Sequence, residues 1–451
     1  MIQVTDYLPT GDAAIAARTA ALTPTILTMQ GSRILAAATE AKELRSQGVD
    51  VCDLTVGDFA PEQFRAPESF LTDVTKEILA GQNQYPPSDG IPELQQAVTS
   101  FYSRELGVTF PAKSVVVCGG ARPPIYAVFR CLVGQGDKVL YFVPGWNNDY
   151  YTQLCHGQHV AVETKPENNF FPTVQDVESH ITDPLVRLVC LNSPLNPCGT
   201  VIDRSVLQGI CQTIVAENRR RVSLGWKPVH LLFDMVYWPL TFGEARFHHP
   251  IELVPEIAPW VVYVDAISKW MVGTGLRLGW AVVPTYLYEP MRDFMGHVGG
   301  WGPRPVQVAT AKFLKNESEF KVFTQGLRNG LQGRLQTVRS FFENMQTDGL
   351  PVESTVPQGA IYLSVRFNII GKTTPSGQVL HTNNDIRQYL LHEAHVALVA
   401  FQAFSLWEDT GWFRISVGAV GTDALNAGLL RLRNAVMALQ PDSGQPIQAT
   451  V

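Results

Sequence analysis

Residues 260–280 read WVVYVDAISKWMVGTGLRLGW, and this stretch decides the fold. It opens with a short, β-branched apolar run that ends at Val264, followed by Asp265 and a segment that carries Lys269. Such a run is typical of a strand covered on both faces, as in a parallel sheet between helices. Most lysines are solvated surface charges, but a lysine between an apolar strand and Trp270 sits where the uncharged, nucleophilic amine is favoured. Lys269 is therefore our first candidate for a chemical role.

Further apolar runs of the same kind occur on both sides of this stretch, between about residues 115 and 285. They are SVVVC (114–118), KVLYFV (138–143), VRLVCL (186–191), VHLLF (229–233) and GWAVV (279–283). Longer segments with helical spacing of apolar residues separate them, among them PIYAVFRCLV (124–133) and SVLQGICQTIVAENRRR (205–221). This alternation predicts an α/β protein with a mostly parallel sheet flanked by helices.

The pattern changes after about residue 305. One long helical stretch (306–345) leads to separate strands at IYLSVRF (361–367) and WFRISV (412–417), and then to a last helix near residue 430. This order predicts a second, smaller α+β domain that the long helix connects to the first. We expect residues 1–25 to form an arm, residues 26–64 and 316–451 the small domain, and residues 65–315 the large domain.

Composition limits the classes of function. Of the 451 residues, 45% are hydrophobic and the formal net charge is -6, with lysine and arginine spread along the chain, which argues against a nucleic acid partner. The N-terminal residues show no signal-peptide pattern, and no apolar stretch is long enough to span a membrane. We therefore expect a cytoplasmic protein that does not enter a membrane. The seven cysteines form no CxxC pair, which favours reduced thiols, and we expect no metal site.

Ligands of open α/β sheets bind at the carboxyl ends of strands, so the residues that follow the apolar runs are the candidates for chemistry. After SVVVC, the turn GGARPP (119–124) opens a helix whose free N–H groups suit a phosphate, although a glycine pair also makes a plain tight turn. After KVLYFV, Trp146 is placed either to stack on a planar ring or simply to pack. After VRLVCL, the turn NSPLNPCGT (192–200) leaves the Asn196 amide free to donate.

Three charged residues add to this set. Asp234 directly follows VHLLF, where a buried carboxylate needs a cation from a neighbouring helix or from a ligand. Arg277 lies in GTGLRLG, whose glycine spacing is only superficially that of a dinucleotide site because it follows no first strand. Arg414 alternates with apolar residues on WFRISV, where its planar fork suits a carboxylate and an exposed strand face is the plain alternative.

The ordered set resembles the fold-type I, class I and II aminotransferases over most of the chain. SKWMVGTGLRLGW is similar to the family's lysine signature, which implies pyridoxal 5'-phosphate as cofactor, Lys269 as its Schiff-base anchor and Arg277 as a phosphate ligand. SPLNPCGT and DMVYW resemble two further elements of the family. Through them the resemblance implies that Asp234 pairs with the pyridinium nitrogen, while Asn196 and Tyr237 contact the phenolic oxygen.

The remaining matches concern the phosphate, the substrate and the partner subunit. NQYPPSDGIPELQQAV (83–98) is similar to a family segment that implies a homodimer, in which Tyr85 reaches the phosphate of the partner's cofactor. Gly57 in LTVGDF and Arg414 match the residues that bind the substrate's α-carboxylate. The other residues matched to cofactor contacts are Gly120, Ala121 and Arg122 of the phosphate-cradling turn and the stacking aromatic Trp146.

The sequence departs from the family pattern at three positions. A hydroxyl residue often stands three residues before the lysine, where this chain has Ala266, and Ser268, Arg277 and Arg122 are the candidates to replace it. Cys198 stands where threonine is usual, a mild change. Arg122 is uncommon in its turn and leaves two interpretations open, a phosphate ligand or a reader of a distal substrate carboxylate.

The resemblance implies ping-pong transfer of an amino group between an amino acid and a 2-oxo acid, with Lys269 moving the α-proton. Aspartate with 2-oxoglutarate is the favoured pair, although the aromatic residues Trp146, Trp238, Trp270 and Trp301 equally suit an aromatic or other donor. A lyase on the same fold is the nearest rival, because it shares the cofactor residues. A cofactor-sensing transcription regulator is disfavoured, because it needs a DNA-binding domain ahead of residue 54 and the N-terminal stretch is too short for one. A nicotinamide dehydrogenase is disfavoured because the glycine spacing around Arg277 resembles a dinucleotide site only superficially.

Overall fold

The computed structural model describes residues 3–440 and contains a seven-stranded sheet with the strand order β2-β8-β7-β6-β5-β3-β4. β8 runs antiparallel to both of its neighbours, whereas the pairs from β7 to β4 are parallel. The predicted α/β class with a mostly parallel sheet is therefore confirmed, and each of the apolar runs forms a strand. The strands are β2 (Val115–Cys118), β3 (Lys138–Val143), β4 (Gln158–Glu163), β5 (Val186–Asn192), β6 (His230–Asp234), β7 (Val261–Ala266) and β8 (Gly279–Val282).

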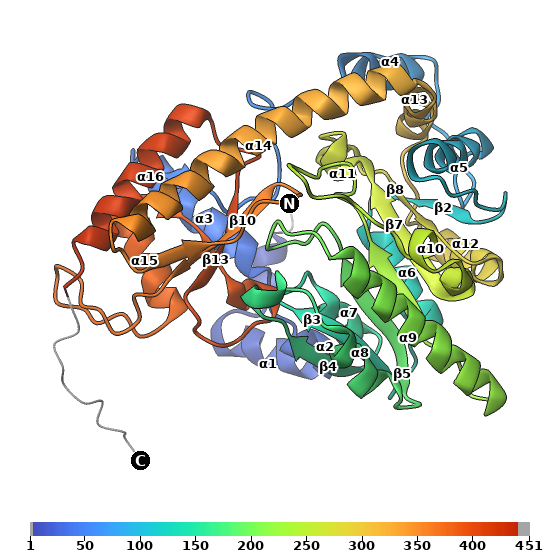
Figure 1. Cartoon of the computed structure of the whole chain (residues 1–451), viewed down its shortest axis with the longest axis horizontal. Helices are drawn as coiled ribbons and strands as arrows, with labels where there is room; N and C mark the ends of the chain where they lie inside the picture. The colour runs from blue at the N-terminus through green and yellow to red at the C-terminus, as the bar shows by residue number, and fades with distance from the viewer. Residues whose placement is uncertain (1–2, 441–451) are drawn as a thin grey trace.

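Helices surround this sheet (Figure 1). Helix α6 packs against β5, β6, β7 and β8, which explains why those strands are apolar along their whole length. Across residues 3–440, no helix is both long and apolar enough to cross a bilayer. The helices up to α12 are α1 (Gly11–Ala21), α2 (Pro24–Thr28), α3 (Arg33–Ser46), α4 (Glu68–Leu79), α5 (Pro92–Leu106), α6 (Arg122–Leu132), α7 (Asn148–Leu154), α8 (Val174–Ile181), α9 (Arg204–Ser223), α10 (Pro250–Leu253), α11 (Ile267–Trp270) and α12 (Thr285–Val298).

A second, four-stranded antiparallel sheet has the order β12-β13-β10-β9 and lies at the other end of the molecule (Figure 1). Its strands are β9 (Val352–Ser354), β10 (Tyr362–Phe367), β12 (Val399–Ala400) and β13 (Trp412–Ser416). Beside it, the short strands β1 (Cys52–Asp53) and β11 (Val396–Ala397) pair in parallel, which joins an early segment of the chain to a late one. Helices α3, α15 (Asn383–Glu393) and α16 (Thr422–Met437) pack with these strands.

The predicted long helix is two helices, α13 (Arg304–Lys315) and α14 (Glu317–Thr347). Asn316 separates them, and its side chain accepts a hydrogen bond from the Glu319 backbone N–H at 3.3 Å as the N-cap of α14. An asparagine at this position satisfies one of the free N–H groups of the new helix. From this cap, α14 runs from the region of α13 and α4 to α16 beside the smaller sheet (Figure 1).

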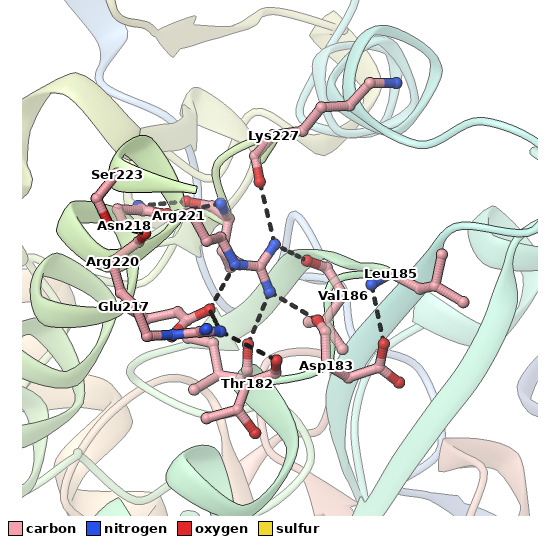
Figure 2. A network of polar contacts seen from close by, with 12 residues as sticks. Thr182, Asp183, Leu185, Val186, Glu217, Asn218, Arg220, Arg221, Ser223 and Lys227 are labelled. Atoms are coloured by element: carbon pink, nitrogen blue, oxygen red, sulfur yellow. Dashed lines mark hydrogen bonds and ion pairs between the residues drawn. The ribbon is translucent and has the colours of Figure 1, made fainter. Parts of the chain in front are cut away.

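The amino-terminal edge of the large sheet is held by a single buried arginine. Arg221, near the end of α9, is fully buried and donates through Nε to Glu217 at 2.7 Å. Its other guanidinium nitrogens donate to backbone carbonyls that end α8, begin β5 and follow α9 (Figure 2). These acceptors belong to Val186, Lys227, Ile181 and Asp183. The carboxyl edge of the sheet lies at the opposite end of the same strands and carries the residues singled out in the sequence.

Candidate active site

Lys269 lies on α11, the single turn that follows β7, and points toward the segment before the large domain. Its Nζ donates to the Gly57 carbonyl oxygen at 2.6 Å, a contact between residues 212 positions apart. A Cβ at position 57 would collide with the Tyr362 hydroxyl, so glycine is needed here for Tyr362 to pack against this part of the backbone. The structure thus brings together two predicted site residues, and it adds Tyr362, which the sequence did not single out.

Asp234 closes β6 next to Asn192, which closes β5, and the two are register partners in the sheet. Both line a hollow together with Trp146. Oδ1 of Asp234 accepts the Val236 N–H at 3.1 Å, and among residues 3–440 no cationic side chain forms an ion pair with this carboxylate. Burial raises the pKa of the Asp234 carboxyl to about 7, and the charge of Lys269 lowers it only in part. The first alternative, an ion pair with a neighbouring helix, is therefore not seen in the described chain.

Tyr237 is buried on the turn after β6, and its hydroxyl hydrogen-bonds the Tyr362 hydroxyl at 2.8 Å. The Lys269 Nζ lies 6.0 Å from the centre of the Tyr237 ring. Burial, together with the neighbouring Tyr362, holds the pKa of the Tyr237 hydroxyl well above its usual value. Burial thus favours the neutral, protonated hydroxyl of Tyr237, and in its hydrogen bond with Tyr362 either hydroxyl can be the donor.

Arg414 is 1% exposed, so a full positive charge is buried next to this pair. Its Nη1 donates to Asn196 Oδ1 at 3.1 Å, its Nη2 donates to the Thr55 carbonyl, and its guanidinium carbon lies 4.4 Å from the Tyr362 ring centre. Because arginine has no acceptor, the atom that faces it must be the Asn196 oxygen, which leaves the Asn196 amide nitrogen to donate elsewhere. The Nε of Arg414 has no partner within residues 3–440, and burial lowers the pKa of the guanidinium.

The turn after β2 and the loop before β8 meet at the start of α6. Gly120 has a φ of 97°, and Nη2 of Arg277 donates to the Gly119 carbonyl at 3.1 Å. This positive φ favours glycine at position 120, and the missing side chain leaves the space that the Arg277 guanidinium occupies. Ala121 caps α6 at its N-terminus, Ser268 is buried next to the lysine, and Ala266 lies against Gly279, where any Cβ would clash.

The remaining predicted residues lie around this centre. The guanidinium carbon of Arg122 stands 5.2 Å from the Trp146 ring centre, so these two residues contact each other directly. Tyr85 is 82% exposed and packs edge-on against Trp301, with ring centres 5.1 Å apart. Its hydroxyl donates to no other predicted site residue. Trp238 and Trp270 are core residues, at 7% and 0% exposure, and each donates its indole N–H to the buried carboxylate of Asp265.

Comparison with known proteins identifies the family. The family model of "Aminotransferase class I and II" matches residues 49–431, most of the chain. The chain belongs to the class I and II aminotransferases. The resemblance read from the sequence and the prediction of a transferase are thereby confirmed.

Individual aminotransferases match nearly the whole chain. The probable aspartate/prephenate aminotransferase of Rhizobium leguminosarum bv. phaseoli is 28% identical and covers 85% of this chain and 91% of its own length. The aspartate aminotransferase of Geobacillus stearothermophilus is 28% identical over 94% of this chain and 99% of its own. Among solved structures, the aspartate aminotransferase of Rhizobium meliloti superposes with a TM-score of 0.83 at 26% identity, covering 93% of this chain and 99% of that one. That of Thermus thermophilus with maleate has a TM-score of 0.80 at 25% identity, covering 92% and 99%.

Proposed function

We propose that this aminotransferase holds pyridoxal 5'-phosphate on Lys269 and moves an amino group between aspartate and 2-oxoglutarate. The observation that carries the proposal is the position of the Lys269 amine, which is held on the Gly57 carbonyl at 2.6 Å and 6.0 Å from the Tyr237 ring centre. Asp234 and Arg414, both without a full set of partners in the described chain, lie close enough to Tyr237 for the charge of each to act on its hydroxyl. Such a cluster of incompletely paired charges is typical of a site that a charged ligand completes.

The residues fit the cofactor at both of its polar ends. Asp234 is a buried carboxylate that lacks a cation, and a protonated ring nitrogen supplies one. At the other end, Gly120 leaves room where a Cβ would strike Arg277, and the start of α6 adds the positive end of the helix dipole and the Arg122 N–H, since Pro123 and Pro124 carry no N–H. Pyridoxal phosphate, when bound, supplies an aldehyde that takes up the amino group and a ring that accepts electrons.

The chain's own side chains divide the remaining work. Arg414 binds the substrate α-carboxylate with the N–H groups that Asn196 and Thr55 do not occupy, among them the N–H of Nε. This grip orients the α-proton toward Lys269, whose Nζ accepts that proton and returns it later in the cycle. Asp234 fixes a proton on the ring nitrogen. Asn196 Nδ2, which the contact with Arg414 leaves free, donates on the phenolic side, and the Tyr237 hydroxyl does the same when Tyr362 is the donor in the hydrogen bond between the two tyrosines.

Aspartate and 2-oxoglutarate are supported by the relatives. Those in Geobacillus stearothermophilus and Rhizobium meliloti are aspartate aminotransferases, and the Thermus thermophilus structure contains maleate, a dicarboxylate. Arg122 contacts the Trp146 ring, which we propose to stack on the cofactor. From this position Arg122 can bind either the cofactor phosphate or a distal substrate carboxylate, so both interpretations stay open. The burial of Trp238 and Trp270 removes part of the argument for an aromatic donor.

The same proposal includes the assembly and the setting of the protein. We infer a homodimer in which Tyr85 of each subunit serves the partner's site, a cytoplasmic location, and the division into an arm, a large domain and a small domain. The exposure of Tyr85 supports the dimer, and the pairing of β1 with β11 supports a small domain built from an early and a late segment of the chain.

Borohydride trapping tests the anchor. The wild-type protein, loaded with pyridoxal phosphate and reduced, gains a stable adduct on the peptide that contains Lys269, and Lys269→Ala gains none and loses transamination by on the order of 10³-fold. Lys321→Ala, a change at an exposed lysine, serves as the control and behaves like wild type. A reducible adduct in Lys269→Ala at wild-type yield would contradict the assignment.

A panel of amino donors against 2-oxoglutarate tests the substrate. Aspartate is expected to give oxaloacetate stoichiometrically, with one oxo acid consumed for each one released. Turnover of the donor without any oxo acid would instead favour the lyase, and transamination of aromatic donors alone would favour the alternative substrate class.

A further inference from the structure

A second buried carboxylate, Asp265, lies behind the proposed cofactor site. It occupies the end of β7 and is 0% exposed. Its Oδ2 accepts hydrogen bonds from the Tyr102 hydroxyl and from Trp238 Nε1, both at 2.8 Å. Its Oδ1 accepts hydrogen bonds from Trp270 Nε1 at 3.0 Å and from the Ala266 N–H at 2.7 Å. Both oxygens are therefore fully used.

All of these donors are uncharged, and within residues 3–440 no cationic side chain forms an ion pair with Asp265. Burial raises the pKa of its carboxyl to about 6, against the effect of the hydrogen bonds. A protonated carboxyl group must donate a hydrogen bond from one of its oxygens. Both oxygens of Asp265 already accept from N–H or O–H groups, so the surroundings favour the deprotonated carboxylate. A buried anion without a counter-ion is costly to maintain, and a well-packed apolar residue would serve packing alone at least as well.

Two of the residues that donate hydrogen bonds to Asp265 are sequence neighbours of proposed site residues. Trp238 directly follows Tyr237, and Trp270 directly follows Lys269. Lys269 and Tyr237 contact each other across the site. The Asp265 carboxylate binds the residue next to each of them, Trp270 through Oδ1 and Trp238 through Oδ2. The third side-chain donor, Tyr102 on α5, accepts a hydrogen bond from Trp280 Nε1 at 2.7 Å, so the anchor is itself held in place.

We propose that Asp265 is a positioning residue that sets where Lys269 and Tyr237 stand relative to the cofactor, through Trp270 and Trp238. The inference rests on the proposed function, since it concerns the same site. Asp265 also places a second negative charge near Asp234, and this charge acts to raise the pKa of the Asp234 carboxyl. The same field favours the protonated ring nitrogen that Asp234 is proposed to bind.

Three tryptophan variants, each tested as the cofactor-loaded enzyme, separate this role from packing. Trp270→Phe and Trp238→Phe each remove one donor to Asp265, whereas Trp280→Phe makes the same loss of an indole and its N–H one step farther from Asp265. We expect all three to lower the midpoint of thermal unfolding. Only Trp270→Phe and Trp238→Phe are expected to weaken the equilibrium binding of pyridoxal phosphate, by up to about tenfold, because part of the free energy of one charge-assisted hydrogen bond must then be replaced by ordering Lys269 and Tyr237 when the cofactor binds.

A spectroscopic readout tests the electrostatic part. Asp265→Asn keeps the shape but removes the charge, so the pH midpoint of the visible absorbance of the Lys269-bound cofactor is expected to fall by about one unit, since a cation nearby loses its stabilisation. Tyr102→Phe retains the charge and is expected to leave the midpoint in place.

The outcomes are separable. Equal effects of Trp280→Phe and Trp270→Phe on cofactor affinity would reduce Asp265 to a packing residue and overturn the inference, as would an unchanged affinity in all variants. If Asp265→Asn does not fold, the tryptophan set still decides the matter. Failure of the wild-type protein to bind or trap the cofactor would instead overturn the proposed function.

Discussion

Asp234 and Arg414 illustrate how incompletely paired charges point to a ligand at the scale of single residues. The carboxylate of Asp234 has no cation within the described chain, and the buried guanidinium of Arg414 keeps one nitrogen without an acceptor. By contrast, Arg221 is equally buried, but it spends its donors on Glu217 and on carbonyls. We therefore propose that a ligand completes the hydrogen bonds and charges of the first two residues, whereas the third binds only the chain itself.

The pH dependence of the cofactor-free protein follows from Asp234. Its pKa is raised from 3.8 to about 7 in the folded protein, so below pH 3.8 both states are protonated, and between these values only the folded state keeps the proton. The proton on Asp234 therefore contributes fully to the free energy of unfolding below about pH 4. This contribution is lost as the pH rises to 7, with a slope of at most about 1.4 kcal/mol per pH unit. Asp234→Asn lacks this loss.

Thermal unfolding of cofactor-free wild type and Asp234→Asn, measured from pH 4 to 8, checks this expectation. The variant should gain stability relative to wild type up to pH 7 and keep a constant advantage above it. Asp203→Asn, at an exposed helix cap whose carboxyl pKa is lowered, serves as the control: above about pH 5 this carboxyl is ionised in both the folded and the unfolded protein, so its difference from wild type should stay nearly flat up to pH 8. A difference between wild type and Asp234→Asn that stays flat from pH 4 to 7 would contradict the prediction.

The sequence predicted the candidate site residues that directly follow strands, whereas the candidates that depend on distant packing come from the structure alone. Lys269 and Asp234 come just after apolar runs, where strand ends predict chemistry. Tyr362 lies inside a strand, and it joins the site only because the antiparallel register of β10 and β13 puts it on the face of Arg414. Asp265 was read merely as the end of a strand, since its donors come from residues 102, 238 and 270. No local pattern encodes such contacts.

Among the elements, the buried strands could be predicted from the sequence, whereas an exposed strand such as β4 could not. The predicted runs are apolar because helices cover both faces, whereas β4 is an edge strand whose residues alternate between exposed and half-buried. A polar edge strand lacks the continuous apolar signal and resembles a loop. The break at Asn316 was missed for a related reason. Helical spacing of apolar residues continues on both sides, and only the capping asparagine marks the new start.

Arg221 is expected to fasten three elements, the end of α8, the start of β5 and the last turn of α9. Arg221→Met removes the charge and the donors while it keeps much of the length, so Glu217 and several buried carbonyls lose partners. Breaking such a buried pair costs about 3–5 kcal/mol in the free energy of unfolding. Urea unfolding measures this loss, and cofactor affinity at low temperature should stay unchanged, because the strand ends that hold the site lie at the opposite edge.

Arg220→Met is the matched control. Arg220 also binds Glu217, at 2.7 Å, but its side chain is 42% exposed, so solvent screens the pair and the loss should be much smaller. Equal destabilisation by the two variants would show that the buried contacts of Arg221 add nothing beyond a surface ion pair.

At the scale of the whole molecule, one predicted site residue does not reach the site of its own chain. Tyr85 is 82% exposed beside Trp301 and hydrogen-bonds none of the residues around Lys269. A large exposed aromatic ring is costly on a free surface, and tyrosine is favoured at interfaces because it is apolar at one end and polar at the other. These properties support a dimer in which each Tyr85 hydroxyl serves the phosphate in the partner's site.

Hybrid dimers test this assignment directly. Tyr85→Phe should weaken cofactor binding about tenfold or more, the loss of one hydrogen bond to a charged group. In a hybrid of one Tyr85→Phe subunit and one Lys269→Ala subunit, the site that keeps Lys269 receives the intact tyrosine from its partner. That site should therefore regain wild-type affinity, measured by cofactor titration of hybrids purified with two different tags. If Tyr85 acted within its own subunit, the hybrid would bind as weakly as Tyr85→Phe alone, because the site with Lys269 would still lack the hydroxyl.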